Sequence, residues 1–280
     1  TGNGVSELIM MSMQGLLDHG DEVLVPAPDY PLWTAAITLA GGTAVHYVCD
    51  EQSEWYPDID DIERKITPHT KAIVIINPNN PTGQVIDPVL LEEIRDICAR
   101  KGIFLYIDEC FLDLAQGGEG LSLARRLRDG ERTLLLKAFT KSYGMAGLRL
   151  GYCLCADPAL LTRMGRATQA WNVSIPAQMA GIAALGQREF LDRARAIIHA
   201  QRPLLAAGLE ALGLTVIPSR TNFLLFFSPR ALGEPLLERG LQIRDCANYP
   251  GLEPGWYRTA VRLPEQNQRL LDAIKEILNG

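Results

Sequence analysis

The sequence predicts an α/β protein in which a mostly parallel sheet lies between two layers of helices, followed by a smaller α+β domain. Strand-like and helix-like segments alternate up to Tyr152, which is typical of parallel sheets built from strand–helix–strand units. KAIVII, residues 71–76, is a run of apolar, mostly β-branched residues that indicates a strand buried on both faces. Helical patterns dominate after Tyr152. We therefore expect a large domain over residues 1–187 and a small domain over residues 188–280.

The composition is that of an ordinary globular protein. The chain has 280 residues, of which 47% are hydrophobic, so it is long enough for a large core. Its formal net charge of −6 is spread through the sequence and gives no basic surface for nucleic acid. No apolar run has the length of a membrane span, and the first residues do not resemble a signal peptide. We expect a cytoplasmic protein that binds neither nucleic acid nor membrane.

The cysteines and histidines do not indicate a metal site. Cys153 and Cys155 alternate with other residues of a predicted strand, which favours packed thiols over metal ligands. The four histidines are scattered singly and form no zinc signature such as HExxH. Nothing in the spacing selects a histidine-based triad. We predict that the protein uses no metal.

The first helix follows a glycine-containing turn. Apolar residues recur at helical spacing from Val5 to Leu16, directly after the polar turn of residues 1–4. A helix N-terminus presents free backbone N–H groups and a positive dipole end, which suit a phosphate. A plain capped helix is the alternative for a turn of this kind.

A short strand at residues 22–26 then ends at a proline-rich turn. The prolines and aspartate of APDYPLW, residues 27–33, predict a loop beyond the strand end. We expect Tyr30 and Trp33 to project from this loop at the sheet edge, where an aromatic side chain stacks on a flat ligand or simply packs. A helix at residues 34–40, a strand at 44–48 and a helix at 58–66 continue the alternation.

The buried strand at residues 71–76 runs directly into NPNNPTG, residues 77–83. Its two prolines exclude a helix, and Gly83 releases the chain. The segment is therefore a rigid loop at a strand's carboxyl end, where ligands bind in doubly wound folds. Asn77, Asn79 and Asn80 could each offer an amide to a ligand, and we expect two of them to bond their own loop instead.

A helix at residues 88–100 leads to a strand that ends at Asp108. An aspartate in this position either caps a helix or holds a buried cation or a protonated ring nitrogen. A helix is expected at residues 121–127, and a strand follows it.

The next segment is KAFTKSYGMAGLRLGY, residues 137–152. Arg149 lies eight positions after Lys141, whereas the same spacing from Lys137 reaches Met145. One interpretation makes Lys141 a Schiff-base lysine and Arg149 an anion clamp. The other is a strand, a glycine turn and a second strand with two surface cations.

The rest of the chain reads as helices followed by strands and a last helix. Its predicted helices cover residues 158–168, 175–185, 190–212 and 264–278, and its predicted strands lie in LTVIP, TNFLLFF, LQIRD and WYRTAVRL. This mixture is the basis for the expected small α+β domain.

The order of these features resembles the fold type I pyridoxal-phosphate enzymes of the class I and II aminotransferase family. NPNNPTG and TKSYGMAGLRLGY carry the resemblance most specifically, and it covers nearly the whole chain. It implies a three-layer αβα large domain, a pyridoxal 5′-phosphate cofactor, a small L-amino acid substrate with a 2-oxo acid as a further possible partner, and a homodimer. Relatives also carry an N-terminal arm and part of the small domain before GNGVSEL, which we expect to be missing here.

The family pattern implies a role for each matching residue. Cofactor binding falls to Val5, Ser6, Tyr30, Asn80, Asp108, Thr140, Lys141 and Arg149. Among these, Lys141 is the catalytic lysine, Asp108 pairs with the ring nitrogen, and Arg149 meets the phosphate. Substrate binding falls to Asn80, Arg244 and Arg258.

The two parts of the chain resemble different relatives. GNGVSELI, APDYPLWTAA and IVIINPNNPTG are similar to alanine-type aminotransferases of bacteria. From about Tyr106 the chain is more similar to threonine-phosphate decarboxylase, a cobalamin-pathway relative of histidinol-phosphate aminotransferase. That resemblance implies a substrate phosphate on Arg244 and a carboxylate on Arg258. The expected reaction is transamination of a small L-amino acid or decarboxylation of O-phosphothreonine, with a histidinol-phosphate-type aminotransferase or a non-catalytic fragment as alternatives.

The chain departs from the common transaminase pattern at two positions. Phe111 stands where a tyrosine commonly bonds the cofactor's 3′ oxygen, and Ala138 stands where many relatives have a phosphate-binding hydroxyl. The second departure leaves more of the phosphate anchoring to Thr140 and Arg149.

Overall fold

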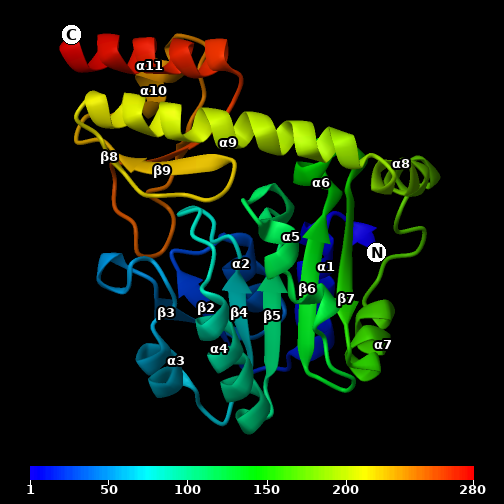
Figure 1. Cartoon of the computed structure of the whole chain (residues 1–280). Helices are drawn as coiled ribbons and strands as arrows, with labels where there is room; N and C mark the ends of the chain where they lie inside the picture. Colours follow the sequence, from blue (N-terminus) through cyan, green and yellow to red (C-terminus); the bar gives the residue numbers. More distant parts are fainter.

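The computed structural model describes all 280 residues and contains two sheets (Figure 1). The larger has seven strands in the order β1-β7-β6-β5-β4-β2-β3. They are β1 (Gly2–Asn3), β2 (Glu22–Ala27), β3 (Thr43–Val48), β4 (Thr70–Ile76), β5 (Phe104–Asp108), β6 (Thr133–Ala138) and β7 (Leu150–Cys155). Strands β2 to β6 are parallel, whereas β7 is antiparallel to both β6 and β1. The predicted mostly parallel sheet is confirmed.

Helices cover both faces of this sheet. One face carries α1 (Val5–Leu16), α2 (Leu32–Leu39) and α7 (Pro158–Arg166), and the other carries α3 (Ile59–Lys65) and α4 (Pro88–Lys101). Alternate residues of β4 point to opposite faces of the sheet. Val74 packs on the face covered by α1, α2 and α7, whereas Ile73 and Ile75 pack on the face covered by α3 and α4. Burial on both faces explains why KAIVII lacks polar positions. These layers form the expected αβα arrangement.

The smaller sheet is antiparallel, with the order β10-β11-β9-β8. Its strands are β8 (Thr215–Val216), β9 (Phe223–Phe227), β10 (Arg244–Asp245) and β11 (Trp256–Ala260). They share a hydrophobic core with α9 (Arg188–Ala211), α10 (Gly233–Glu238) and α11 (Pro264–Asn279). The start of α9 coincides with the predicted domain boundary at residue 188, which itself stays a prediction.

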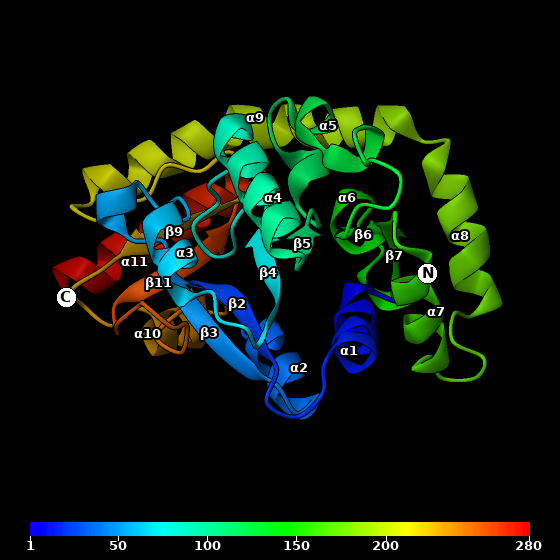
Figure 2. The same cartoon turned by 90° about the horizontal axis from the view of Figure 1, so that it is seen from below.

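Helix α9 runs across the whole molecule, from the end of α8 (Ile175–Leu185) to the small sheet (Figures 1 and 2). In its first half, Leu191 and Ile198 pack on Leu114, which follows β5. Its second half contributes Leu205 and Leu209 to the small-domain core. Pro203 lies inside the helix, between these two contact regions. No helix of the structure combines the length and the apolar character needed to cross a membrane.

Two local predictions were wrong. Trp33 does not project from a loop, because it belongs to α2 and is fully buried with its ring edge against Tyr106. The helix predicted at residues 121–127 is replaced by the short helix α5 (Gly118–Leu121) and a separate turn of 3₁₀ helix. Ser122 separates the two, since its backbone is extended and its hydroxyl accepts a hydrogen bond from the N–H of Ala124.

Candidate active site

A cavity of about 320 Å³ opens where three parallel strands end. Ile76, Asp108 and Ala138 are the last residues of β4, β5 and β6, and all three line it. The full lining is Val5, Ser6, Ile9, Tyr30, Ile76, Asn80, Asp108, Cys110, Phe111, Ala138, Thr140, Lys141, Arg149 and Arg258. Every predicted site residue except Arg244 therefore lies around one cavity. This is the sheet edge at which ligands bind in α/β folds.

The NPNNPTG loop holds its shape through its own asparagines. The Asn77 side-chain oxygen accepts from the N–H of Ile86, and that of Asn79 accepts from the Thr82 N–H and hydroxyl. The third amide points elsewhere, since the oxygen of Asn80 accepts a hydrogen bond from Arg258. Asn79 bonds its own loop as predicted, Asn77 bonds Ile86 three residues beyond that loop, and Asn80 is the one that reaches the cavity.

The N-terminus of α1 forms one wall of the cavity. Gly4 caps this helix with φ 76° and no side-chain cap, which leaves the N–H groups of the first turn available. A Cβ atom on Gly4 would lie 2.8 Å from Nη2 of Arg149, so only glycine allows the guanidinium to come this close. The hydroxyls of Ser6 and Thr140 lie on the same cavity. Together these donors suit a phosphate dianion.

Lys141 lies in the short helix α6 (Phe139–Ser142), directly after β6. Its Nζ lies 5.3 Å from the centre of the Phe111 ring. Burial lowers the pKa of Lys141, and the positive charges of Arg258 and Arg149 lower it further. A lowered pKa increases the fraction of neutral amine, which is the nucleophilic and basic form.

Asp108 forms the floor of the cavity and has little solvent exposure. The N–H of Cys110 donates to its Oδ1 at 3.0 Å. No cation of the protein forms an ion pair with this carboxylate. Burial raises the pKa of Asp108, and hydrogen bonding from Cys110 opposes that increase. A buried carboxylate without its own cation fits a protonated ring nitrogen, as in pyridoxal phosphate.

The two arginines of the small domain lie on neighbouring strands. Arg258 of β11 is directly opposite Arg244 of β10 in the antiparallel register, so both side chains leave the same face. Arg258 lines the cavity, with its guanidinium 5.1 Å from the centre of the Phe223 ring. Arg244 does not line it: this exposed side chain donates to Asn248 at 3.0 Å.

Cys110, Ile9 and Ile76 line the cavity, although sequence reasoning did not select them as site residues. Cys110 could have been found, because it stands two residues after a strand-end aspartate. Ile9 lies one helical turn after Val5, so the helical period that predicted α1 also places it on the same face.

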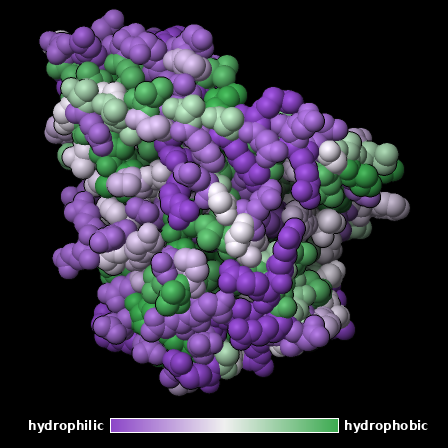
Figure 3. Space-filling model, in the orientation of Figure 1, coloured by the Kyte–Doolittle hydropathy of each residue, from purple (hydrophilic) through white to green (hydrophobic).

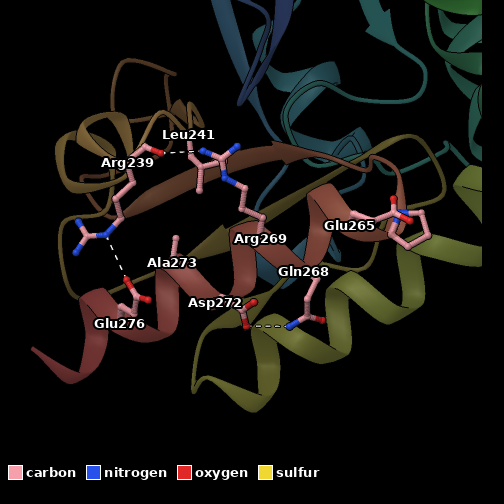
Figure 4. A pocket seen from close by; sticks show the side chains of 9 residues that line it. Arg239, Leu241, Glu265, Gln268, Arg269, Asp272, Ala273 and Glu276 are labelled. Carbon is pink, nitrogen blue, oxygen red and sulfur yellow. Dashed lines mark hydrogen bonds and ion pairs between the residues drawn. The ribbon is translucent and has the colours of Figure 1, made fainter.

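A second hollow lies far from this chemistry, on the outer side of the small domain (Figure 4). It measures about 740 Å³ and is bordered by α11 and the end of α10. Most of its polar side chains are already engaged: Arg239 forms an ion pair with Glu276 at 3.6 Å, and Gln268 donates to Asp272 at 2.9 Å. The hollow contains none of the predicted site residues, so the cavity at the strand ends is the better candidate.

Comparisons with known proteins agree with this geometry. Residues 1–274 match the model of the family described as Aminotransferase class I and II. Glutamate-pyruvate aminotransferase AlaA of Haemophilus influenzae is 51% identical over 157 residues, which are 56% of this chain and only 39% of that protein. Threonine-phosphate decarboxylase of Salmonella typhimurium is 34% identical over 286 residues, covering 100% of this chain and 76% of that protein.

Solved structures show the same arrangement of elements. The histidinol-phosphate aminotransferase from Clostridium acetobutylicum superposes with a TM-score of 0.89 at 25% identity, covering 99% of this chain and 83% of that one. The alanine aminotransferase from Pyrococcus furiosus gives 0.88 at 28% identity, covering 99% and 75%. The chain belongs to the class I and II aminotransferase family, whose members depend on pyridoxal phosphate.

Proposed function

We propose that this chain binds pyridoxal phosphate and decarboxylates a small L-amino acid with a second anionic group, of which O-phosphothreonine is the best candidate. The observation that carries this choice is the pairing of Arg244 with Arg258. Like charges at directly opposite positions of a sheet destabilise it, unless anionic groups offset the repulsion. A substrate with a carboxylate at one end and a phosphate at the other supplies two such groups.

The residues around the cavity support the parts of this reaction. Bound pyridoxal phosphate withdraws electrons from the substrate Cα, so that the bond held perpendicular to its ring can break. Arg149, Thr140 and the first turn of α1 hold the phosphate, while Asp108 keeps the ring nitrogen protonated. Arg258, oriented by Asn80, binds the substrate carboxylate. In this proposal Tyr30 stacks on the ring.

Transamination is the second candidate, and the identity of 51% with AlaA favours it. Both reactions start from pyridoxal phosphate that is attached to Lys141. They differ in the bond that is broken: in transamination Lys141 Nζ accepts the proton of Cα, whereas in decarboxylation the bond from Cα to the carboxylate breaks, carbon dioxide leaves and a proton takes its place on Cα. An assay with O-phosphothreonine, and a second with alanine and 2-oxoglutarate, separates them by carbon dioxide or keto acid release.

Arg244→Gln tests the choice of substrate. We expect it to raise KM for O-phosphothreonine about 10- to 100-fold, since a charge-assisted hydrogen bond contributes ~1.5–3 kcal/mol, and to leave any turnover of alanine unchanged. Arg239→Gln is the matched control, because this arginine lies on the distant hollow. An unchanged KM in Arg244→Gln would exclude a phosphate contact at this arginine. A wild-type protein that never retains pyridoxal phosphate would overturn the proposal as a whole.

We also propose that the protein forms a homodimer through α8. This helix exposes an apolar face that consists of Ile175, Met179, Ile182 and Leu185. Figure 3 shows apolar side chains gathered at the projecting edge where Figure 1 places α8. A hollow of about 1100 Å³ beside it is also lined by Phe139, which immediately precedes Thr140 of the candidate site. An exposed apolar patch of this kind is typical of a protein interface, and its continuity with the site favours a second copy of the chain.

Leu185→Asp tests this interface. We expect the variant to be monomeric by light scattering at concentrations where the wild type is dimeric, because the substitution places a charge in an apolar contact. Leu237→Asp on α10 is a matched control, since both leucines are 60% exposed. Equal masses for the two variants would show that α8 is not the interface.

A further inference from the structure

The second lysine of the sequence motif, Lys137, has a defined place beneath the candidate site. It lies in β6 with only 6% of its surface exposed, and it does not line the cavity. Its Nζ donates to Oδ1 of Asp113 at 2.7 Å and lies 3.2 Å from Oε2 of Glu109. Burial lowers the pKa of Lys137, but the two carboxylates outweigh this effect and raise it. Lys137 is therefore a buried cation, and it is not available as a nucleophile.

The carboxylates of Glu109 and Asp113 also accept hydrogen bonds from groups other than Lys137. Glu109 follows Asp108 directly in the chain, and it accepts hydrogen bonds from the hydroxyl of Ser122 at 2.6 Å and the N–H of Leu123 at 3.1 Å. On the opposite side of the lysine, Oδ2 of Asp113 accepts from the hydroxyl of Ser142 at 3.2 Å. The Lys137 ammonium group thus joins β6 to the segment after β5, and Asp113 joins that segment to Ser142 in the segment after β6.

This connection reaches the residue next to Lys141. Ser142 ends α6, which has only four residues, and a helix of that length does not hold its conformation by itself. Gly144 follows with φ 64° and has no neighbour against which a side chain would rest. The hydrogen bond from buried Ser142 to Asp113 is therefore a tertiary anchor for the segment that carries Lys141.

The two ends of the network carry groups that act on one cofactor. Glu109 adjoins Asp108, which suits the ring nitrogen, and Ser142 adjoins Lys141, which suits the carbonyl carbon. The distance between those two atoms of pyridoxal phosphate is fixed, so Lys141 and Asp108 must be held at a matching separation. An error of ~1 Å in such a placement can cost ~100-fold in rate.

We propose that Lys137, acting through Asp113 and Ser142, is a positioning residue that holds the Lys141 amine in reach of the cofactor carbonyl. The inference rests on the proposed binding of pyridoxal phosphate, but not on the choice between decarboxylation and transamination. It assigns Lys137 a role in the attachment of the cofactor, the step in which Lys141 Nζ attacks the aldehyde carbon and water leaves.

Ser142→Ala is the most direct test, because it removes one hydroxyl and leaves both ion pairs of Lys137 in place. Ser122→Ala is the matched control: it removes a serine hydrogen bond from the same buried network, on the side away from Lys141. Apoprotein would be mixed with pyridoxal phosphate, reduced with borohydride at timed intervals, and analysed by peptide mass spectrometry. Reversible binding before reduction would be measured by fluorescence quenching, and thermal unfolding of the apoproteins would be compared.

We expect Ser142→Ala to slow labelling of Lys141 about tenfold, with reversible binding and apoprotein unfolding close to those of Ser122→Ala. Lys137→Met should slow it further, and Asp113→Asn should resemble Ser142→Ala. Equal labelling rates for Ser142→Ala and Ser122→Ala would overturn the inference, even if Lys137→Met fails to fold. Label on Lys137 in the wild type would overturn it as well. A wild type that takes no label at all would contradict the proposed function instead.

Discussion

Lys141→Ala is expected to abolish covalent attachment of pyridoxal phosphate and to lower turnover by about 10⁴-fold, the upper range for loss of a positioned acid–base group. In the proposed function the same Nζ is the attachment point and, in transamination, the base that takes the Cα proton. Lys137, the other lysine of the motif, cannot replace it, because its ammonium group is held by Glu109 and Asp113. Turnover and borohydride labelling would be measured side by side.

Lys101→Ala is the control for this prediction, since Lys101 is an exposed lysine at the end of α4. It should label and turn over like the wild type. If Lys141→Ala retained a stoichiometric label on another lysine, the assignment of Lys141 would be wrong. Loss of label together with unchanged turnover would show that the reaction needs no covalent attachment.

Arg95→Met is expected to lower the free energy of unfolding by about 3–5 kcal/mol, the usual cost of removing one partner from a buried ion pair. The side chain of Arg95 is 4% exposed; its guanidinium binds both carboxylate oxygens of Glu131 and donates to the carbonyl oxygen of Arg126 at 2.8 Å. It thereby joins α4 to the segment before β6. Urea unfolding at neutral pH would measure the loss. Arg100→Met is the control, because its side chain is 63% exposed.

The ion pair of Arg95 and Glu131 also predicts that the free energy of unfolding falls at acidic pH. Burial raises the pKa of Glu131, but hydrogen bonds from Arg95 and Thr133 outweigh it and bring the pKa to about 2. A folded pKa below the unfolded value contributes stability above about pH 4.5, and this is lost as the pH falls towards 2. The contribution is at most ~3 kcal/mol, less any solvent screening. Arg95→Met should flatten this part of the stability curve, and an unchanged curve would contradict the pairing.

The large domain could be predicted closely because its sequence is consistent at every level. Doubly buried strands such as KAIVII have one dominant pattern, and strand-end residues of a parallel sheet must meet at one edge. That rule placed the NPNNPTG loop at a ligand-binding edge, whereas the resemblance to the aminotransferase family assigned Asn80, Asp108 and Lys141 to one cofactor. Trp33 was misplaced because the prolines around it suggested a loop, whereas Pro31 actually caps α2. Proline suits a helix start as well as a turn.

Other features depend on contacts between segments far apart in the sequence. The pairing of Arg244 with Arg258 requires the register of β10 and β11, which two short strands do not specify by pattern. The sequence motif gave Lys137 no role, because its partners Asp113 and Glu109 lie 24 and 28 residues earlier in the chain. Burial and charge balance within a folded core decide its role, and neither can be read from spacing.

The proline inside α9 has a mechanical consequence. Helix α9 is continuous across both domains. Its first half packs against Leu114 of the large domain, and its second half forms part of the small-domain core. Pro203 removes one backbone hydrogen bond between these halves, so bending is easiest there. Arg258 moves with the outer half, whereas Arg195 of the inner half donates to the backbone of Asp113 at 2.6 Å. Bending at Pro203 would move Arg258 towards or away from Lys141, while the segment that carries Lys141 stays in place.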